Sequence, residues 1–479
     1  MAVVSAPRFP QVKQMRSPEA LRERLAQLGI GHLGVDDSVD PNGPLAQPFD
    51  LVDGSAGRRR VGNRFTMLPM EGWDGTEAGA PSDLVERRWI RMGTSGAKLI
   101  WGEATAVVPE GRANPNQLML NDETAQRFAG LRAAVADAHR DRFGTDDDLV
   151  IGLQLTHSGR WSRPDGSPRP RLAHDDPLLA RRTGSGAVVM SDADLDELVG
   201  AYVRAAVLAR RAGFDFVDVK HCHGYLLHEL LSATDRAGRY GGDLSGRTAF
   251  LCRVVDGIRA AAPDLAVAVR LSVYDFVPFT PGADRVGVPE SSRAEHAFGG
   301  DGSGVGVDLG ETHAFLDRCG DLGIGLVSVT AGSPYTTPHI QRPASFPPSD
   351  GYLPPEDPLV GVARLAAATA ELQRRHRDLA LVAGAMSYLQ DWLPNVAQAL
   401  VRHEAATSIG LGRMALAYPD LPADVLAGRP VDRRRICRTL SDCTTAPRNG
   451  LVSGCYPLDP FYKERPERVA LAAIKRAKR

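Results

Sequence analysis

A cluster of reactive side chains directly follows one apolar segment near the middle of the chain. Residues 215–247 begin with alternating apolar residues, the pattern of a buried parallel strand. The side chains that come next can donate, accept or titrate: Lys220, His221, Cys222, His223 and Tyr225. Such groups are rarely used to build a hydrophobic core. Because they stand where a core strand ends, we expect them at the rim of an active site.

Two kinds of chemistry follow from these residue types alone. His221 and His223 have the spacing H-x-H, which ligates a metal in other proteins, but no further ligands stand at other strand ends. A lysine such as Lys220 at the end of a barrel strand also fits a Schiff-base lyase, which is the alternative from a different enzyme class. For His221 and Cys222 a place in the wall of the fold is the simpler expectation.

The elements that must position these residues alternate along the chain as strand and helix. Eight apolar segments rich in Val, Ile and Leu predict strands at residues 61–68, 98–103, 149–155, 214–220, 265–272, 324–330, 379–384 and 405–410. Apolar residues that recur at three- and four-residue intervals predict helices at residues 81–96, 123–140, 192–212, 247–262, 359–375 and 388–403. The alternation predicts an α/β fold with a parallel sheet, and eight repeats predict a closed (β/α)8 TIM barrel.

Segments outside this alternation of strands and helices are predicted to be additions to the barrel. We expect an N-terminal extension at residues 1–50, the barrel at residues 51–428 and a C-terminal cysteine-containing tail at residues 429–479. Residues 278–307, rich in Gly and Asp, predict an insertion over the barrel mouth. The proline-rich residues 333–358 predict a structured lid or wall.

The composition limits the partners and the compartment. With 43% hydrophobic residues, 24% charged residues and a net charge of -1, the chain has no basic field for nucleic acid or an anionic membrane. It contains no apolar run of about 18 residues and no secretory signal. Its six cysteines in 479 residues do not indicate a disulfide framework. We therefore expect a cytoplasmic enzyme that acts on a small molecule, and a homo-oligomer is left open.

Polar residues collect where the predicted strands end, which is where a (β/α)8 barrel carries its reactive groups. Such ends carry Glu71, Glu103, Gln154, His157, Arg160, Lys220, His223, Arg270, Thr330 and Ser333. In the last two loops, the backbone at Gly384, Gly410 and Gly412, beside Arg413, predicts a phosphate cradle. The alternative is that these glycines only close tight turns.

Seven motifs in a fixed order relate the chain to a known family. They are N-R-F-x-x-x-P-M (63–70), G-E-A-x-A-V-x-P-E-G-R (102–112), Q-L-x-H-x-G-R (154–160), H-G-Y-L-L-H-E (223–229), R-Y-G-G (239–242), V-R-L-S (269–272) and G-L-G-R (410–413). On these residues the chain resembles the Old Yellow Enzyme family of flavin-dependent NAD(P)H oxidoreductases, particularly the branch related to 2,4-dienoyl-CoA reductase. The resemblance covers about residues 55–428.

This resemblance implies a non-covalent FMN over the barrel mouth. The residues implied to hold it are Pro69, Met70, Glu71, Ala104, Gln154, Arg270, Ser333, Gly384, Ala385, Gly412 and Arg413. Gln154 would bond the pyrimidine edge, and Arg270 would lie beside N1 and O2, where a cation favours hydride acceptance. We expect the additional flavin and nucleotide domains of the branch to be absent, so that NAD(P)H would reduce the FMN directly.

The resemblance also implies a reaction of the ene-reductase type. Hydride would pass from flavin N5 to an activated C=C bond of an unsaturated carbonyl or thioester. Lys220 and His223 would bind the carbonyl oxygen, and Tyr225 would protonate the α-carbon. Lys220 departs from the family, which usually has His there, and Glu71 departs from a small or neutral residue. The alternatives on the same barrel are a flavin amine dehydrogenase or demethylase and a desaturase.

The cysteines of the tail resemble a metal site only in part. The related branch binds an iron–sulfur cluster through cysteines spaced C-x2-C-x3-C-x11-C. Cys443 and Cys455 keep the last gap, but Ile436 and Thr439 occupy the two earlier positions, and Cys437 is displaced by one. A 4Fe-4S cluster on Cys437, Cys443 and Cys455 would need an outside ligand or a shifted loop. The alternative is that the thiols are buried and bind no metal.

Overall fold

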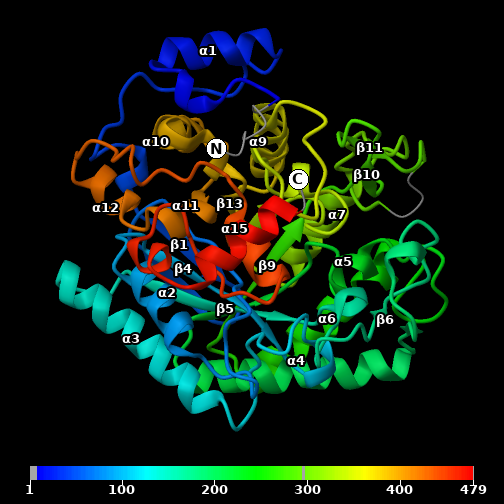
Figure 1. Ribbon diagram of the computed structural model, residues 1–479. Helices are drawn as coiled ribbons and strands as arrows, with labels where there is room; N and C mark the ends of the chain where they lie inside the picture. The colour runs from blue at the N-terminus through cyan, green and yellow to red at the C-terminus, as the bar shows by residue number, and fades with distance from the viewer. Residues whose placement is uncertain (1–7, 294–296, 478–479) are drawn as a thin grey trace.

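Eight parallel strands form a closed barrel, as the spacing of the apolar segments predicts (Figure 1). The structure is a computed structural model that describes residues 8–293 and 297–477. The barrel strands are β3 (Phe65–Met67), β4 (Leu99–Ala106), β5 (Val150–Thr156), β8 (Phe216–Val219), β9 (Ala266–Ser272), β12 (Leu326–Thr330), β13 (Ala380–Ala383) and β14 (Ser408–Leu411). Every residue of these strands is buried. They are therefore covered on both faces, because helices cover the outside and side chains fill the inside.

The first predicted strand differs most from the structure. Its residues 61–68 are divided between β2 (Gly57–Val61) and β3. The turn between them is made by Asn63, which accepts a hydrogen bond from the backbone of Phe65 at 3.1 Å and donates to the carbonyl of Gly96 at 2.8 Å. A side-chain hydrogen bond thus ends one strand and starts the next.

Helices alternate with the barrel strands and form the outer layer seen in Figure 1. They are α2 (Asp83–Gly93), α3 (Ala125–Phe143), α4 (Asp192–Arg211), α6 (Leu244–Ala261), α7 (Gly310–Asp321), α9 (Pro358–Arg375) and α10 (Leu393–Arg402). Ser82, Ser191, Asp243 and Asp357 cap four of them by accepting hydrogen bonds from backbone amides. The sequence predictions omit α7, which begins directly after the glycine-rich insertion. None of the described helices is long and apolar enough to cross a membrane.

A hairpin seals the amino end of the barrel. Strands β1 (Phe49–Asp53) and β2 pair antiparallel, and Phe49, Leu51 and Val61 pack against inward side chains such as Trp101 and Phe216. The sequence pattern does not predict β2, which reads Gly-Arg-Arg-Arg-Val and is largely exposed. With this end closed, access to the barrel interior is left at the carboxyl end.

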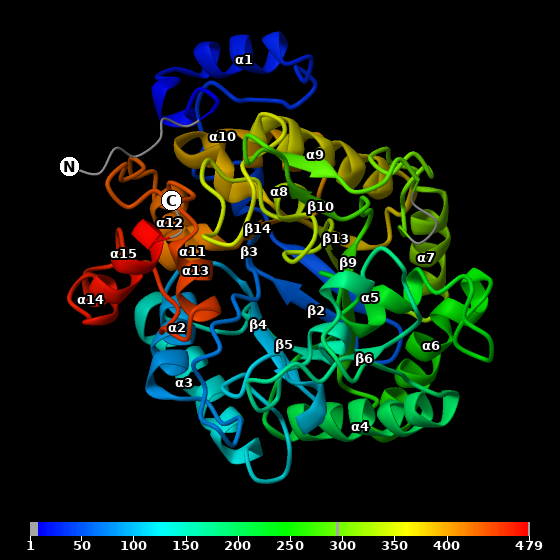
Figure 2. The ribbon, with the colours of Figure 1, turned by 45° about the vertical axis from the view of Figure 1, so that its right-hand side comes forward.

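Two irregular stretches interlock over the carboxyl end, which is the barrel mouth (Figure 2). The predicted insertion contains the hairpin of β10 (Phe279–Pro281) and β11 (Gly287–Pro289). It pairs with the proline-rich stretch through a bridge between Val286 and Leu353, and Phe279 packs on Tyr352 with ring centroids 5.8 Å apart. The predicted lid is thus held to the insertion by backbone and aromatic contacts.

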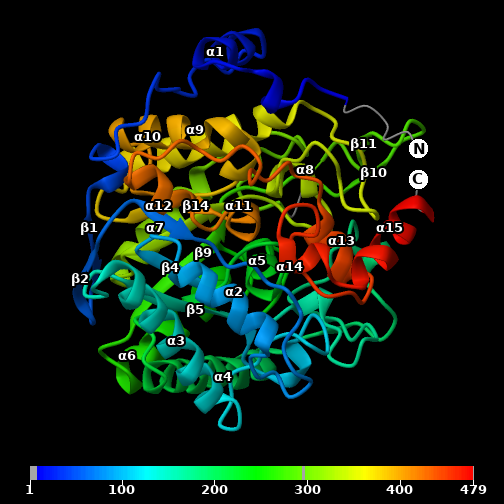
Figure 3. The same ribbon diagram turned by 60° about the vertical axis from the view of Figure 1, so that its left-hand side comes forward.

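The N-terminal and C-terminal segments pack on different parts of the barrel. Helix α1 (Pro18–Gln27) reaches the cap of α9 through an ion pair between Arg24 and Asp357 at 2.7 Å. The tail contains α13 (Asp442–Arg448), α14 (Pro460–Lys463) and α15 (Glu467–Ala477), and it lies beside α2 in Figures 2 and 3. There Arg87 pairs with Asp459 at 3.0 Å. Residues 1–7 of the predicted extension, 294–296 of the insertion and 478–479 of the tail lie outside the described residues.

Candidate active site

One cavity at the barrel mouth brings together residues from most of the strand ends. We call it the mouth cavity, and its volume is about 180 Å³. The predicted site residues that line it are Pro69, Met70, Glu71, Gln154, Lys220, His223, Arg270, Ala385, Gly412 and Arg413. Gln154, Arg270, His223 and Arg413 come from four different strands or strand ends and share this one space. The closed parallel barrel is what makes them neighbours.

Four of the predicted flavin and substrate residues do not line the mouth cavity. Ser333 is hydrogen-bonded to the carbonyl of His223 at 3.1 Å and therefore supports the backbone of that residue. At Gly384 a Cβ would lie 2.4 Å from the carbonyl oxygen of Val329, so its small size permits close strand packing. Ala104 is buried within β4. Tyr225 lies just behind the lining, where its ring packs against Lys220.

A buried carboxylate that the sequence analysis missed holds two of the lining residues. Asp218 lies in β8 and accepts hydrogen bonds from the Gln154 amide at 2.5 Å, the indole of Trp101 at 2.9 Å and the backbone of Arg270 at 2.7 Å. Burial raises the pKa of Asp218 to about 6 despite these hydrogen bonds. The signal in the sequence is a lone acid in an apolar strand. With its amide nitrogen fixed, Gln154 keeps its side-chain oxygen for a ligand.

Three arginines of the mouth cavity have buried nitrogens without a hydrogen-bond partner in the described protein. These atoms are Nε of Arg270, Nη2 of Arg342 and Nη1 of Arg413. Arg413 is fixed by donating to the carbonyl of Pro343 at 2.7 Å. Burial and the nearby cations Arg448 and Arg413 lower the pKa of Arg342 to about 9. Unsatisfied buried cations of this kind require an anion.

Arg342 is a second residue that the sequence analysis missed. It follows α8 (Pro338–Gln341) in the proline-rich stretch, where nothing in the local pattern distinguishes it from a surface arginine. Its other guanidinium nitrogen donates to Thr444 of the tail, and Thr444 and Ser453 also line the mouth cavity. The tail therefore forms part of the cavity wall.

Lys220, His223 and Glu71 also line the mouth cavity. Burial and the cations Arg270 and Lys220 hold the pKa of His223 well below its ordinary value, so this imidazole is neutral at pH 7. Glu71 accepts hydrogen bonds from the indole of Trp73 at 2.7 Å and from the amide of Gln117 at 2.6 Å. Its burial raises its pKa, and Lys220 acts in the opposite direction.

Tyr225 keeps its proton in this environment. Burial raises the pKa of Tyr225 well above its ordinary value, with a further contribution from Glu71. The ammonium of Lys220 lies 4.1 Å from the centroid of the Tyr225 ring. The hydroxyl of Tyr225 lies 3.3 Å from the hydroxyl of Tyr335. The side chain is thus a neutral phenol that can act as a proton donor.

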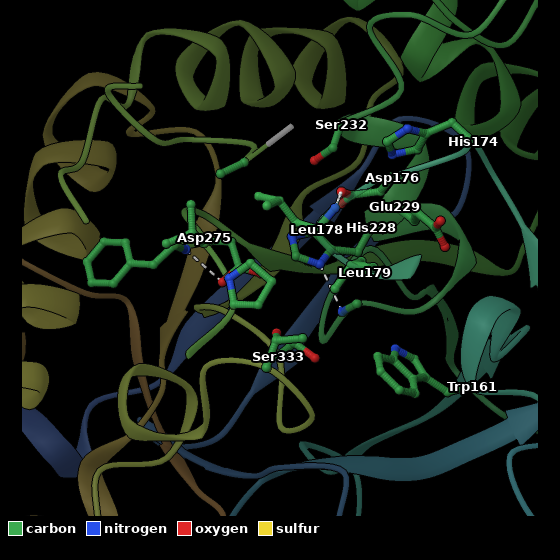
Figure 4. A pocket seen from close by; sticks show the side chains of 16 residues that line it. Trp161, His174, Asp176, Leu178, Leu179, His228, Glu229, Ser232, Asp275 and Ser333 are labelled. Carbon is green, nitrogen blue, oxygen red and sulfur yellow. Dashed lines mark hydrogen bonds between the residues drawn. The ribbon is translucent and has the colours of Figure 1, made fainter. Parts of the chain in front are cut away.

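A second, smaller pocket, which we call the lateral pocket, is lined by Gly224, the residue that follows His223 (Figure 4). Its labelled side chains include Trp161, His228, Asp275 and Ser333. Gly224 separates it from the mouth cavity, with φ of 71° and a position where a Cβ would lie 2.8 Å from Oγ of Ser333. Only glycine fits this wall without displacing Ser333 and, with it, His223.

The tail cysteines lie together around one small cavity. Cys437, Cys443 and Cys455 are free and line one small cavity with Arg413. Burial raises the pKa of Cys443 to about 11, so it is a thiol at pH 7. In the described part of the chain, no three His, Cys, Asp or Glu side chains are arranged to hold a metal ion. The predicted metal role of these cysteines is therefore not supported, since Ile436 and Thr439 stand where further ligands would be needed.

Comparison with known proteins identifies the family of this chain and solved structures that share its fold. A family model described as "NADH:flavin oxidoreductase / NADH oxidase family" matches residues 47–294. A protein named NADPH dehydrogenase from Geobacillus sp. (strain WCH70) is 30% identical over 222 residues, which are 46% of this chain and 61% of that protein. The chain thus spans about three fifths of the length of this relative.

Two solved structures share the fold. A structure of 2-naphthoyl-CoA reductase with 2-naphthoyl-CoA has a TM-score of 0.67 and 18% identity, over 88% of this chain and 58% of the other. The old yellow enzyme homologue from Zymomonas mobilis has a TM-score of 0.56 and 22% identity, over 81% of this chain and 94% of the other. At these identities the likeness establishes the barrel alone, and it confirms the predicted fold class.

Proposed function

Because the chain belongs to the NADH:flavin oxidoreductase / NADH oxidase family, we propose that it is an FMN-dependent NAD(P)H oxidoreductase that reduces an activated C=C bond of an unsaturated carbonyl or thioester. The observation that carries this proposal is the mouth cavity, where unpartnered nitrogens of Arg270, Arg342 and Arg413 share one space with Lys220 and the neutral His223.

The residues of the mouth cavity fit FMN by their chemistry. Arg342 and Arg413 offer buried, unpartnered donors suited to a phosphate, and Gly412 and Ala385 line the cavity beside them. Arg270 and Gln154 offer a cation and an amide for the polar edge of the ring system. Pro69 and Met70 supply an apolar surface for its flat face. When bound, the flavin supplies the acceptor and donor of hydride.

The remaining residues act on the substrate in this proposal. Lys220 and His223 bind the substrate oxygen, which makes the β-carbon electrophilic. Tyr225 holds a proton for the α-carbon, and its raised pKa keeps that proton in place until the reaction needs it. Lys220 and Arg270 would repel the ammonium form of an amine, which favours C=C reduction over amine oxidation.

An absorption spectrum of the purified protein, followed by anaerobic mixing with NADPH and NADH, tests the proposal. We expect FMN bands that bleach with one or both nucleotides and return when an α,β-unsaturated ketone is added. A protein that is colourless and does not take up FMN would refute it. Borohydride trapping of a carbonyl compound on Lys220 would instead support the alternative function, a Schiff-base lyase.

A further inference from the structure

A large cleft lies at the amino end of the barrel, opposite the mouth. We call it the amino-end cleft, and its volume is about 850 Å³. It lies where α9 and α10 end and where β3 and β14 begin, since Arg64 and Thr407 directly precede these two strands. The two helices lie side by side in Figures 1, 2 and 3. None of the described residues that line this cleft also lines the mouth cavity.

Positive charge gathers in the amino-end cleft. Its charged lining residues are Arg64, Arg374, Arg377 and Arg402, against the single acid Glu404. The whole chain has a net charge of -1, so this excess is local and does not follow from the composition. Arg402 has its own counter-ion, because Asp36 pairs with it at 2.6 Å. Three cations therefore remain without one.

These three arginines have no acid directly beside them. Within residues 8–293 and 297–477, no carboxylate oxygen lies within 4.0 Å of a guanidinium nitrogen of Arg64, Arg374 or Arg377. Their side chains donate to backbone carbonyl groups instead. The dipole of α9 favours a cation in its last turn, which is a sufficient reason for Arg374. Arg64 lies outside any helix, so this reason does not extend to it.

Arg64 is half-buried and held in one orientation. Its Nε donates to the carbonyl of Gln47 at 3.0 Å, and its Nη1 donates to the carbonyl of Thr407 at 3.1 Å. Its guanidinium carbon lies 5.2 Å from the centroid of the Phe49 ring. Burial and the nearby cation Arg60 lower the pKa of Arg64. Because nothing in the described chain accepts from its Nη2, this fixed cation is preorganised to bind an anion.

We propose that the amino-end cleft binds an oligophosphate, a small molecule with a chain of two or more phosphate groups, through Arg64, Arg374 and Arg377. A guanidinium presents paired donors that match two phosphate oxygens, and successive phosphates of a chain can each meet a different arginine. The cleft has the size of sites that take a whole small molecule. Its described lining contains no Trp, Tyr or Phe on which a base could stack, so the phosphates carry the recognition.

Isothermal titration calorimetry of the protein in saturating FMN, which fills the mouth cavity, tests this inference. Sodium tripolyphosphate should bind one to one, ATP and CTP should bind alike, and orthophosphate and citrate should bind more weakly. In Arg374→Gln/Arg377→Gln, which changes two exposed residues, the Kd for tripolyphosphate should rise on the order of 10-fold. The matched control, Arg204→Gln/Arg211→Gln, removes two exposed arginines of α4 and should keep the wild-type affinity.

Four results would overturn the inference. The first is wild-type protein in which tripolyphosphate produces neither heat nor a rise in Tm. The second is equal weakening in the two double variants, which would attribute binding to net charge. The third is loss of binding in Arg342→Ala instead of the cleft variant, which would place the anion in the mouth cavity. The fourth is binding of citrate or of a single-stranded RNA in preference to tripolyphosphate, which would identify a different class of ligand.

Discussion

The carboxylate of Asp218 accepts the side-chain amide of Gln154 at 2.5 Å, and both groups are buried inside the barrel. The same carboxylate accepts the backbone amide of Arg270. One acid on β8 thus fixes groups on both neighbouring strands, β5 and β9. The polar edge of the mouth cavity is therefore set by the interior of the barrel and not by its loops.

The first prediction concerns the pH dependence of stability through Asp218. Its pKa is about 6 in the folded protein and about 3.9 in an unfolded chain. Between these values the folded state binds the additional proton, so this residue makes the free energy of unfolding fall as pH rises from about 4 to about 6, by about 1.4 kcal/mol per pH unit.

Urea unfolding of the cofactor-free protein at pH 4.5 and at pH 6 measures this slope. Asp218→Asn should remove the contribution, because the amide does not titrate. Asp284→Asn, which changes an exposed acid of the insertion, is the control and should keep the wild-type slope. A variant slope equal to that of the wild type would show that Asp218 is not protonated in this range.

The second prediction separates the phosphate from the ring of the cofactor. Arg342→Ala should weaken FMN binding by on the order of 10- to 100-fold, because a buried charge-assisted hydrogen bond is lost. Riboflavin lacks the phosphate, so its affinity should change little. Flavin fluorescence titration of the apoprotein measures both affinities, with Arg374→Ala, an exposed arginine of α9, as the control. Equal weakening of both flavins would place Arg342 away from the phosphate.

The third prediction concerns the proton donor. Tyr225→Phe should slow reoxidation of the reduced enzyme by an unsaturated substrate by on the order of 10²- to 10⁴-fold, the usual contribution of general acid catalysis. Flavin reduction by NAD(P)H needs no proton from this residue and should remain near the wild-type rate. Stopped-flow absorbance resolves the two half-reactions. Tyr335→Phe, which removes the neighbouring hydroxyl, should have a smaller effect, and loss of both half-reactions in Tyr225→Phe would contradict the assignment.

The fourth prediction concerns the wall between the two cavities. Gly224→Ala places a Cβ at a backbone φ of 71° and 2.8 Å from Oγ of Ser333. Gly242→Ala has a similar φ of 78° but no atom within 4 Å of the new Cβ, so it measures the backbone effect alone. Both should lower the free energy of unfolding by about 1 kcal/mol through the backbone. Gly224→Ala should lose about 1 to 3 kcal/mol more through the collision, and it should also raise KM by displacing His223.

Thermal and urea unfolding of the two variants, with steady-state kinetics, provide the comparison. A Gly224→Ala protein that is no less stable than Gly242→Ala would show that Ser333 moves away from the new Cβ without a cost in free energy. An unchanged KM would show that the position of His223 does not depend on this wall.

The sequence determined the barrel and the order of its parts. Short apolar runs rich in Val, Ile and Leu and helical stretches of period 3.6 are local signals, so seven of the eight predicted strands lie close to the observed ones. The motifs led to the family, which the family model confirms over residues 47–294. Because strand ends meet at one edge of a barrel, Gln154 and Arg270 were predicted to share a cavity, and they do.

Only the tertiary structure decided the roles of Arg342, Asp218 and the tail cysteines, because these roles depend on residues that are distant in the chain. Arg342 looks like a surface residue until the tail covers it, and Asp218 looks like an exception in a strand until Trp101 and Gln154 surround it. Spacing alone could not tell whether the tail cysteines form a metal site, since a site requires thiols that converge from several directions. Long-range packing sets burial and pairing of charge, and these decide what each polar side chain can do.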